Sequence, residues 1–177
     1  FWKAIGGVYP ETAHQRCWVH KIANVLDKLP KRLQSKAKEL LHQIMNAEGR
    51  KAAEGEMTRF EAIYRDKHPK AVEALIKDKE ALFTYFNYPE AHWIHLRTTN
   101  PIESTFATVK LRTKKTRGAG SRKAAMAMGF QLMSAAEDRW RRITSPERVV
   151  EVMQGTRFID GVREIKEEIK TPERDAA

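Results

Sequence analysis

Residues 31–47 read KRLQSKAKELLHQIMNA. Apolar side chains recur in this stretch at intervals of three and four residues: Leu33, Ala37, Leu40, Leu41 and Ile44. Such spacing is typical of a helix that buries one face and exposes the other. Pro30 precedes the stretch and Gly49 follows it, and both residue types favour helix boundaries. We therefore predict a helix at 31–47 with one face in a core.

The same helical pattern extends on both sides, from Glu11 to Tyr88, and Pro30, Gly49 and Pro69 divide it. It predicts further helices at 12–28, 50–66 and 70–87. Because each would have an apolar face to bury, the four helices together favour a bundle.

The pattern changes after residue 91. A short run of apolar side chains at His92–Thr98 predicts a strand. Asn100 is then predicted to cap a new helix, with Pro101 at its first position and Glu103 at its third. The apolar stripe of this helix is predicted to be buried: Ile102, Phe106 and Val109.

The net charge of +10 is concentrated in one region, because residues 104–136 hold seven basic side chains and no acidic one. These are Lys110, Arg112, Lys114, Lys115, Arg117, Arg122 and Lys123. Gly118 and Gly120 predict a loop in which the backbone can approach a ligand closely. No aromatic residues are interleaved, so the segment favours contact with phosphates over base stacking, although a solvated run of charges is the alternative.

A helix from Ser121 to about Arg142 should follow this basic loop. Its apolar residues lie on every side, which predicts that most of it is buried. From Pro146 a short helix and a mixed-charge tail with a fraying end are expected. The tryptophans Trp18, Trp93 and Trp140 are predicted to be core residues.

Cys17 is the single cysteine, which excludes an internal disulfide and favours a reducing cytoplasm. The longest apolar-rich run, Ala124–Ala136, is shorter than the roughly 20 residues of a membrane span, so no membrane partner is expected. The chain starts at Phe1 without a methionine or a signal-peptide pattern, which suggests a fragment.

Cys17 and His20 stand three residues apart, a spacing that can place a thiolate and an imidazole on one metal ion. Only His14 offers a third ligand nearby. A closed zinc site needs four ligands, so zinc is not expected, and a buried cysteine beside a packed or capping histidine is the favoured interpretation.

Glu103 can be interpreted in two ways. An acid three positions after an Asn cap is most often a capping residue. Helical spacing, however, places Glu103 on one face with Ala107, Lys110 and Lys114, where a divalent metal could lie near a phosphate backbone. One carboxylate does not make a two-metal site, because phosphoryl transfer needs several oxygen ligands.

Three strings carry a resemblance to a known family: QRCWVHK at 15–21, RTTNPIE at 97–103 and TKKTRGA at 113–119. Together they resemble the mutator-type transposases of bacterial insertion sequences, from Phe1 to about Ile143. The resemblance implies an RNase H-like domain in which two Asp and one Glu hold two Mg²⁺ (or Mn²⁺) ions. Such DDE enzymes cleave transposon ends and join them to target DNA.

Carried onto this chain, the resemblance makes Glu103 the third catalytic carboxylate and a metal ligand. Cys17 and His20 match the family's Cys-x-x-His element, which lies in a helical insertion. Both catalytic Asp residues would precede Phe1, so the chain alone is expected to bind DNA weakly and cut nothing. Arg97 and Asn100, in the second string, join the seven basic side chains as expected DNA contacts.

We therefore predict a mainly α chain. Residues 1–10 would be the end of an RNase H-like segment, and residues 11–90 a helical insertion domain. Residues 91–143 would be the C-terminal remnant of an RNase H-like α/β catalytic domain. A C-terminal helix and tail occupy 144–177. The predicted function is DNA transposition in a bacterial, nucleoid-associated cytoplasmic setting, with a homo-oligomer in the complete enzyme. The alternatives are a non-catalytic helical DNA-binding protein, such as a truncated transposase relic, and a zinc-dependent interaction module.

Overall fold

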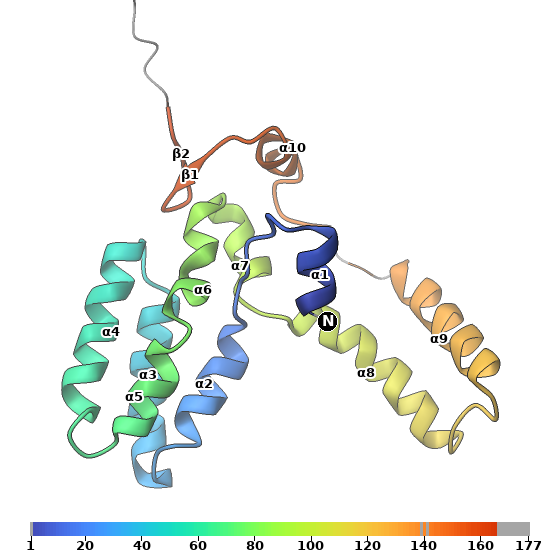
Figure 1. Cartoon of the computed structure of the whole chain (residues 1–177), viewed down its shortest axis with the longest axis horizontal. Coiled ribbons are helices and arrows are strands. Elements are labelled where there is room, and N and C mark those ends of the chain that lie inside the picture. Colours follow the sequence, from blue (N-terminus) through green and yellow to red (C-terminus); the bar gives the residue numbers. More distant parts are fainter. Residues whose placement is uncertain (1, 139, 141, 166–177) are drawn as a thin grey trace, which may run out of the picture.

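Helices form almost all of the regular structure in the part of the chain that the computed structural model describes, residues 2–138, 140 and 142–165 (Figure 1). The prediction of a mainly α chain is confirmed. The helices are α1 (Trp2–Val8), α2 (Trp18–Leu26), α3 (Lys31–Met45), α4 (Arg50–Tyr64), α5 (Pro69–Ile76), α6 (Lys79–Phe83), the 3₁₀ turns η1 (Thr84–Asn87) and η2 (Glu90–His92), α7 (Trp93–Leu96), α8 (Asn100–Lys115), α9 (Arg122–Glu137) and α10 (Glu147–Met153). β1 (Phe158–Ile159) and β2 (Val162–Arg163) pair antiparallel. None of the described helices is long and apolar enough to cross a membrane.

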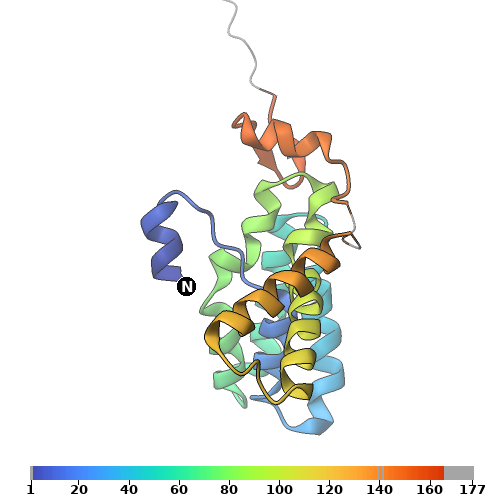
Figure 2. The same ribbon diagram turned by 90° about the vertical axis from the view of Figure 1, so that its right-hand side faces the viewer.

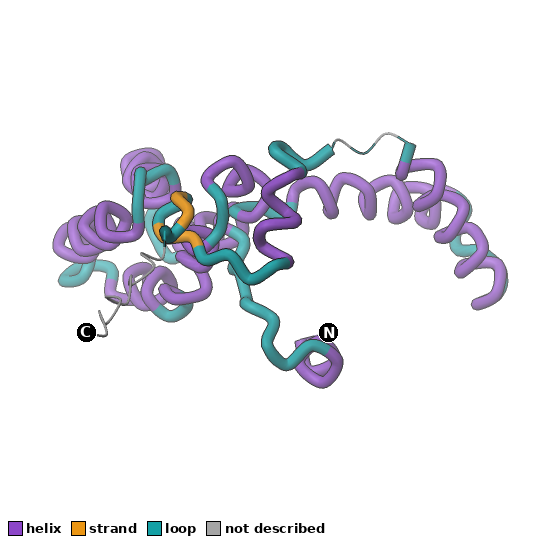
Figure 3. Tube along the Cα trace, turned by 90° about the horizontal axis from the view of Figure 1, so that it is seen from above, coloured by secondary structure: helices purple, strands orange, loops and turns teal. Residues whose placement is uncertain are grey.

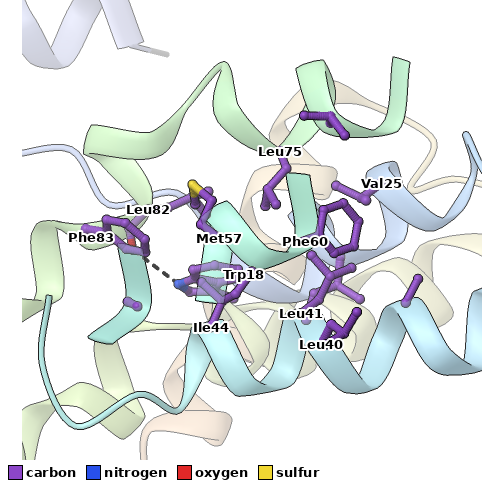
Figure 4. Packing of buried hydrophobic residues seen from close by; sticks show 14 of the residues in the cluster. Trp18, Val25, Leu40, Leu41, Ile44, Met57, Phe60, Leu75, Leu82 and Phe83 are labelled. Atoms are coloured by element: carbon purple, nitrogen blue, oxygen red, sulfur yellow. Dashed lines mark hydrogen bonds between the residues drawn. The ribbon is translucent and has the colours of Figure 1, made fainter. Parts of the chain in front are cut away.

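Residues 18–96, from α2 to α7, form a helical domain with one hydrophobic core (Figure 4). In α3 the periodic side chains Ala37, Leu40, Leu41 and Ile44 are buried, as their spacing predicts, and Leu33 is partly buried against the same core. Helix α4 packs against α3 with its own row of buried side chains: Ala53, Met57, Phe60 and Tyr64. Each large apolar side chain removed from water stabilises the domain by about 1.5–3 kcal/mol.

Two of the predicted helices are shorter than expected. Helix α2 begins only at Trp18, because the preceding residues bond in an irregular conformation to the 81–85 region; Arg16 N–H donates to the carbonyl of Ala81 over 2.7 Å. The helix predicted at 70–87 is divided into α5, α6 and η1. Its tighter last turn buries the adjacent rings of Tyr85 and Phe86.

The strand predicted at 92–98 is wrong, because this segment contains the end of η2 and the short helix α7. Trp93 explains the difference. Its ring packs edge-on against Tyr85 and Phe86, and its indole N–H donates to the carbonyl of Tyr88 over 2.9 Å. The next residue, Ile94, is 65% exposed.

Helices α8 and α9 form an antiparallel hairpin that extends away from the helical domain (Figures 1 and 3). The predicted burial of its apolar side chains is wrong for Phe106, which is 55% exposed, and for α9, in which Phe130 is 69% exposed and no residue is buried. Val109 is partly buried, and the side chain of Ile102 lies outside the described part of the structure. Trp140, predicted as core, is 54% exposed. Within the described residues the two helices pack mainly on each other, and most of their remaining surface is exposed. Helix α1 likewise stands apart from the helical domain (Figure 2).

The C-terminal segment returns to the helical domain through α10 and the β1–β2 hairpin (Figure 1). Phe158 is buried, Gly161 N–H donates to the carbonyl of Phe86, and Glu90 N–H donates to the carbonyl of Gly161. The expected short helix is present as α10. The mixed-charge segment after it forms the β1–β2 hairpin, and the fraying expected at the polar end of the tail falls on residues 166–177, which lie outside the described part.

Candidate functional site

The Cys-x-x-His element lies directly beside the start of α8. The backbone N–H of Trp18 donates to the carbonyl of Arg97 over 2.9 Å, which ties the beginning of α2 to the segment that leads into α8. The strings at 15–21 and 97–103 therefore meet in space. Cys17 and Thr99, which make the contact, are 82 positions apart in the sequence.

The first turn of α2 is anchored by buried side chains. Trp18 is fully buried and its indole N–H donates to the carbonyl of Leu82 over 3.1 Å. Lys21 is only 3% exposed, and its Nζ donates to the carbonyl of Ala74 at 2.6 Å and to Asp78 Oδ2 at 2.7 Å. These bonds satisfy a buried ammonium group that would otherwise be costly. The positions of Cys17 and His20 are thus held by the core of the helical domain.

Thr99 connects Cys17 with Glu103. Its hydroxyl lies 3.4 Å from Cys17 Sγ and also donates a hydrogen bond to Glu103 Oε1. Helix α8 begins one residue earlier than the sequence predicts, so its N-cap is Thr99 and not Asn100. Glu103 N–H donates to the carbonyl of Thr99 over 3.0 Å, and the two residues are therefore joined through both backbone and side chain.

His20 reaches Glu103 directly, with its Nε2 3.6 Å from Glu103 Oε1. Both side chains are about half exposed, at 54% and 50%, so this pair adds little to stability. What it does is place an imidazole beside the carboxylate. The carboxylate of Glu103 accepts from the hydroxyl of Thr99 and faces the Cys-x-x-His element, so both interpretations of Glu103 stay predictions.

The environment of Cys17 favours its thiolate. Burial raises the pKa of the Cys17 thiol, but hydrogen bonds with Thr99 and His20 together outweigh it and lower the pKa from the ordinary 9.0 to about 7. Sequence analysis named Cys17, His20 and Glu103 as candidates, yet it missed Thr99, the residue that links two of them. The signal was present, because Thr directly before the Asn-Pro pair is itself a preferred N-cap.

The described residues do not form a metal site by themselves. No group of three or more His, Cys, Asp or Glu side chains that could hold an ion is found among them. At the start of α8 they supply one carboxylate, whereas two divalent cations in line with a phosphate need several oxygen ligands. The ligands that the described residues offer therefore do not by themselves fit a two-metal centre.

The seven basic side chains lie along the second half of α8, across the turn and on the first turn of α9: Lys110, Arg112, Lys114, Lys115, Arg117, Arg122 and Lys123. All seven are exposed, and no ion pair within the described part of the chain involves them. We call residues 110–123 the basic hairpin tip. Gly118 and Gly120, with φ of 102° and 71°, make the turn, and Ser121 caps α9 by accepting from Ala124 N–H.

Arg97 and Asn100 differ from the basic hairpin tip. The guanidinium of Arg97 donates to the carbonyl of Met45 and to Asn46 Oδ1 at 2.9 and 3.0 Å, and it lies over the Tyr85 ring. Arg97 thus joins the entry of α8 to the end of α3, and its contact with DNA stays a prediction. The side chain of Asn100 lies outside the described part of the structure.

Comparison with known proteins gives consistent matches. A family model described as "Transposase, Mutator family" matches residues 1–143. A transposase for insertion sequence element IST2 of Acidithiobacillus ferrooxidans is 49% identical over 162 residues, which are 92% of this chain and 55% of the relative. A transposase for insertion sequence element IS6120 of Mycolicibacterium smegmatis is 50% identical over 161 residues, 91% of this chain and 50% of the relative. The chain thus spans about half the length of these relatives.

Proposed function

Since this chain belongs to the Mutator family of transposases, we propose that it works in DNA transposition as part of a DDE-type, metal-dependent strand-cleaving and strand-joining enzyme. In this proposal Glu103 is the third catalytic carboxylate and a ligand of Mg²⁺ or Mn²⁺. The other two carboxylates come from outside the 177 residues, and residues 91–143 belong to an RNase H-like catalytic domain.

The observation that carries the proposal is that one helix bears both Glu103 and the start of the basic hairpin tip. Glu103 lies in the first turn of α8, and Lys114 lies 11 residues further along, which is about 16 Å at 1.5 Å per residue. A DNA backbone held by the basic hairpin tip and lying along α8 would therefore bring a phosphate to Glu103. Bound counterions released from DNA would favour the contact.

The exposed apolar side chains of the α8–α9 hairpin support a further part of the proposal. Phe106, Leu111, Met126 and Phe130 are each more than half exposed. Exposed apolar surface of this kind marks contacts with other protein. We propose that the rest of the catalytic domain, or another protomer of a homo-oligomer, covers it in the complete enzyme.

DNA binding can be tested on this chain by fluorescence anisotropy with a labelled duplex across a salt series. Each phosphate contact contributes about 0.9 to the slope of log affinity against log salt. The double variant Lys114→Gln/Lys115→Gln is expected to weaken binding and reduce this slope by about 2. The charge-matched control Arg157→Gln/Arg163→Gln, in the β-hairpin, should leave both unchanged. Equal effects of the two double variants would mean that only net charge matters.

Catalysis is tested with the complete coding sequence in a strand-cleavage assay. Glu103→Gln keeps the shape of the side chain and removes its charge, so it is expected to abolish Mg²⁺-dependent cleavage while DNA binding persists. Full cleavage by this variant would reject the catalytic assignment. It would leave the non-catalytic DNA-binding protein as the better description.

A further inference from the structure

We propose that the Cys-x-x-His element positions the carboxylate of Glu103, with Cys17 acting through the hydroxyl of Thr99 and His20 acting by direct contact. The inference rests on the catalytic role proposed above for Glu103. It gives Cys17, His20 and Thr99 a role as positioning residues, distinct from metal binding and from DNA contact.

Thr99 lies between the two groups that it links. Its hydroxyl is 3.4 Å from Cys17 Sγ and donates to Glu103 Oε1. A hydroxyl has one hydrogen and two lone pairs. Beside a Cys17 thiolate the sulfur competes for that hydrogen, whereas the S–H of the Cys17 thiol can donate to the hydroxyl oxygen and leave the hydrogen for Glu103 Oε1. The sulfur then fixes the orientation of the hydroxyl, and the hydroxyl fixes the carboxylate.

The two sides of this contact differ in rigidity. Cys17 is 8% exposed and precedes the fully buried Trp18, so the α2 side is held by the core. Glu103 is half exposed on a helix whose hairpin extends away from the helical domain (Figure 1). A long exposed side chain samples several rotamers, and fixing one of them costs up to about 2 kcal/mol. Contacts from a rigid helix reduce that cost at the moment of catalysis.

The contacts on Glu103 Oε1 come from two sides. Thr99 approaches from the helix's own N-terminus, while His20 approaches from α2, with its Nε2 3.6 Å away. Two contacts on one oxygen restrict the carboxylate far more than either does alone. Misplacement of a catalytic group by about 1 Å can cost as much as a hundred-fold in rate.

The test uses the complete transposase and compares Thr99→Val, Thr99→Ser and His20→Asn with the wild type. Single-turnover cleavage rate, DNA dissociation constant and melting temperature are measured for each. We expect Thr99→Val and His20→Asn to cleave about ten- to a hundred-fold more slowly with an unchanged dissociation constant. Thr99→Ser, which keeps the hydroxyl, should restore most of the rate. His42→Asn, an exposed histidine on α3, is the matched control and should change nothing.

The outcomes separate this inference from the proposed function. If Glu103→Gln stops cleavage while Thr99→Val and His20→Asn cleave at the full rate, the positioning role is overturned and the catalytic role of Glu103 stands. A weaker dissociation constant with an unchanged rate also overturns it, because the residues would then serve DNA binding. If Glu103→Gln cleaves normally, the proposed function itself fails.

A readout independent of activity is available in this 177-residue chain. Three-bond NMR couplings of the Glu103 side chain report how many rotamers it samples. We expect increased rotamer averaging in Thr99→Val and in His20→Asn but not in His42→Asn. Since His20 is half exposed, its substitution is compatible with folding even if Thr99→Val is not. Unchanged couplings in His20→Asn would contradict the direct contact.

Discussion

Asp160 accepts a 2.6 Å hydrogen bond from the backbone N–H of Arg50, the first residue of α4, across 110 positions of the sequence. The N-cap of α4 is Gly49, which has no side chain to satisfy the free N–H groups at this end. The carboxylate of Asp160 does so instead, and its negative charge suits the positive end of the helix dipole. The C-terminal β-hairpin is thus an integral part of the helical domain.

Asp160→Ala is therefore expected to lower the free energy of unfolding by about 1 kcal/mol, the usual effect of removing a helix cap. Asp160→Asn keeps an oxygen acceptor and tolerates the positive φ of 48°, so its loss should be smaller. Urea titration measures the stability of both variants. Hydrogen exchange at the Arg50 amide should be faster in Asp160→Ala than in the wild type. An unchanged exchange rate in this variant would show that the carboxylate does not cap α4.

The pair of Lys21 and Asp78 predicts a loss of stability in acid. The hydrogen bond from Lys21 lowers the pKa of Asp78 below its ordinary 3.8, against the opposite effect of partial burial. Because the folded pKa is depressed, the unfolded chain binds the proton first as the pH falls. The stabilisation from this carboxylate is thus complete above about pH 5 and is lost as the pH falls through 3.8 towards the folded pKa.

Asp78→Asn tests this contribution. At pH 7 it is expected to reduce the free energy of unfolding by roughly 1–3 kcal/mol, because the buried ammonium group of Lys21 loses its charged partner. The difference from the wild type should shrink between pH 5 and pH 3. A constant difference over that range would mean that the pKa of Asp78 is not coupled to folding. Asp66→Asn, an exposed acid in the loop after α4, serves as the control.

The pKa of about 7 at Cys17 predicts unusual thiol chemistry. The rate of alkylation by iodoacetamide follows the thiolate fraction, so it should rise through about pH 7 instead of near the ordinary 9.0. Burial also makes the reaction slow at every pH, and its effect on the pKa is already contained in the value of about 7. In Thr99→Val the midpoint is expected to move to higher pH, because one hydrogen bond to the sulfur is lost. An unchanged midpoint would contradict the contact between Thr99 and Cys17.

The buried residues of the helical domain could be predicted from helical spacing within each helix. The conformation of residues 92–98 could not, because it depends on contacts with other helices. Ala37, Leu40 and Ile44 follow helical spacing and face the core because α3 has a partner along its whole length. Trp93 and Ile94 looked like part of a strand, but packing of Trp93 on the rings of η1 made the segment helical.

The α8–α9 hairpin shows the limit of predicting burial from composition. The apolar residues of α9, such as Met126 and Phe130, indicated a buried helix, and they are exposed because α8 alone cannot cover them. Sequence composition reports what a helix can bury, but it does not say whether the partner is within the same 177 residues.

The candidate site was half predictable. The resemblance, together with residue type and spacing, singled out Cys17, His20 and Glu103 as candidates, but nothing local indicated that Thr99 contacts both Cys17 and Glu103. The C-terminal hairpin, in contrast, had a clear local signal that sequence analysis missed. Asp160-Gly161 follows the apolar pair Phe158-Ile159 and precedes the β-branched Val162, and both turn residues have the positive φ of a type I′ turn.

Arg117 combines conformational strain with a position at the centre of the basic hairpin tip. Its φ is 54°. At the end of α8 the N–H of Arg117 donates to the carbonyl of Lys114, and the N–H of Gly118 donates to the carbonyl of Thr113. In such a helix ending the position of Arg117 is usually glycine, since an L side chain costs about 1 kcal/mol there. Strained residues are often found at functional sites.

Arg117→Gly should therefore change stability and DNA binding in opposite directions. We expect the free energy of unfolding to rise by up to about 1 kcal/mol, because the strain is relieved. DNA binding should weaken, with a salt slope lower by about 0.9, because one phosphate contact is lost. Arg117→Asn, which tolerates positive φ and removes the charge, should bind as weakly as the glycine variant. If Arg117→Gly is more stable and binds DNA as the wild type does, the arginine is not retained at this strained position for contact with phosphate.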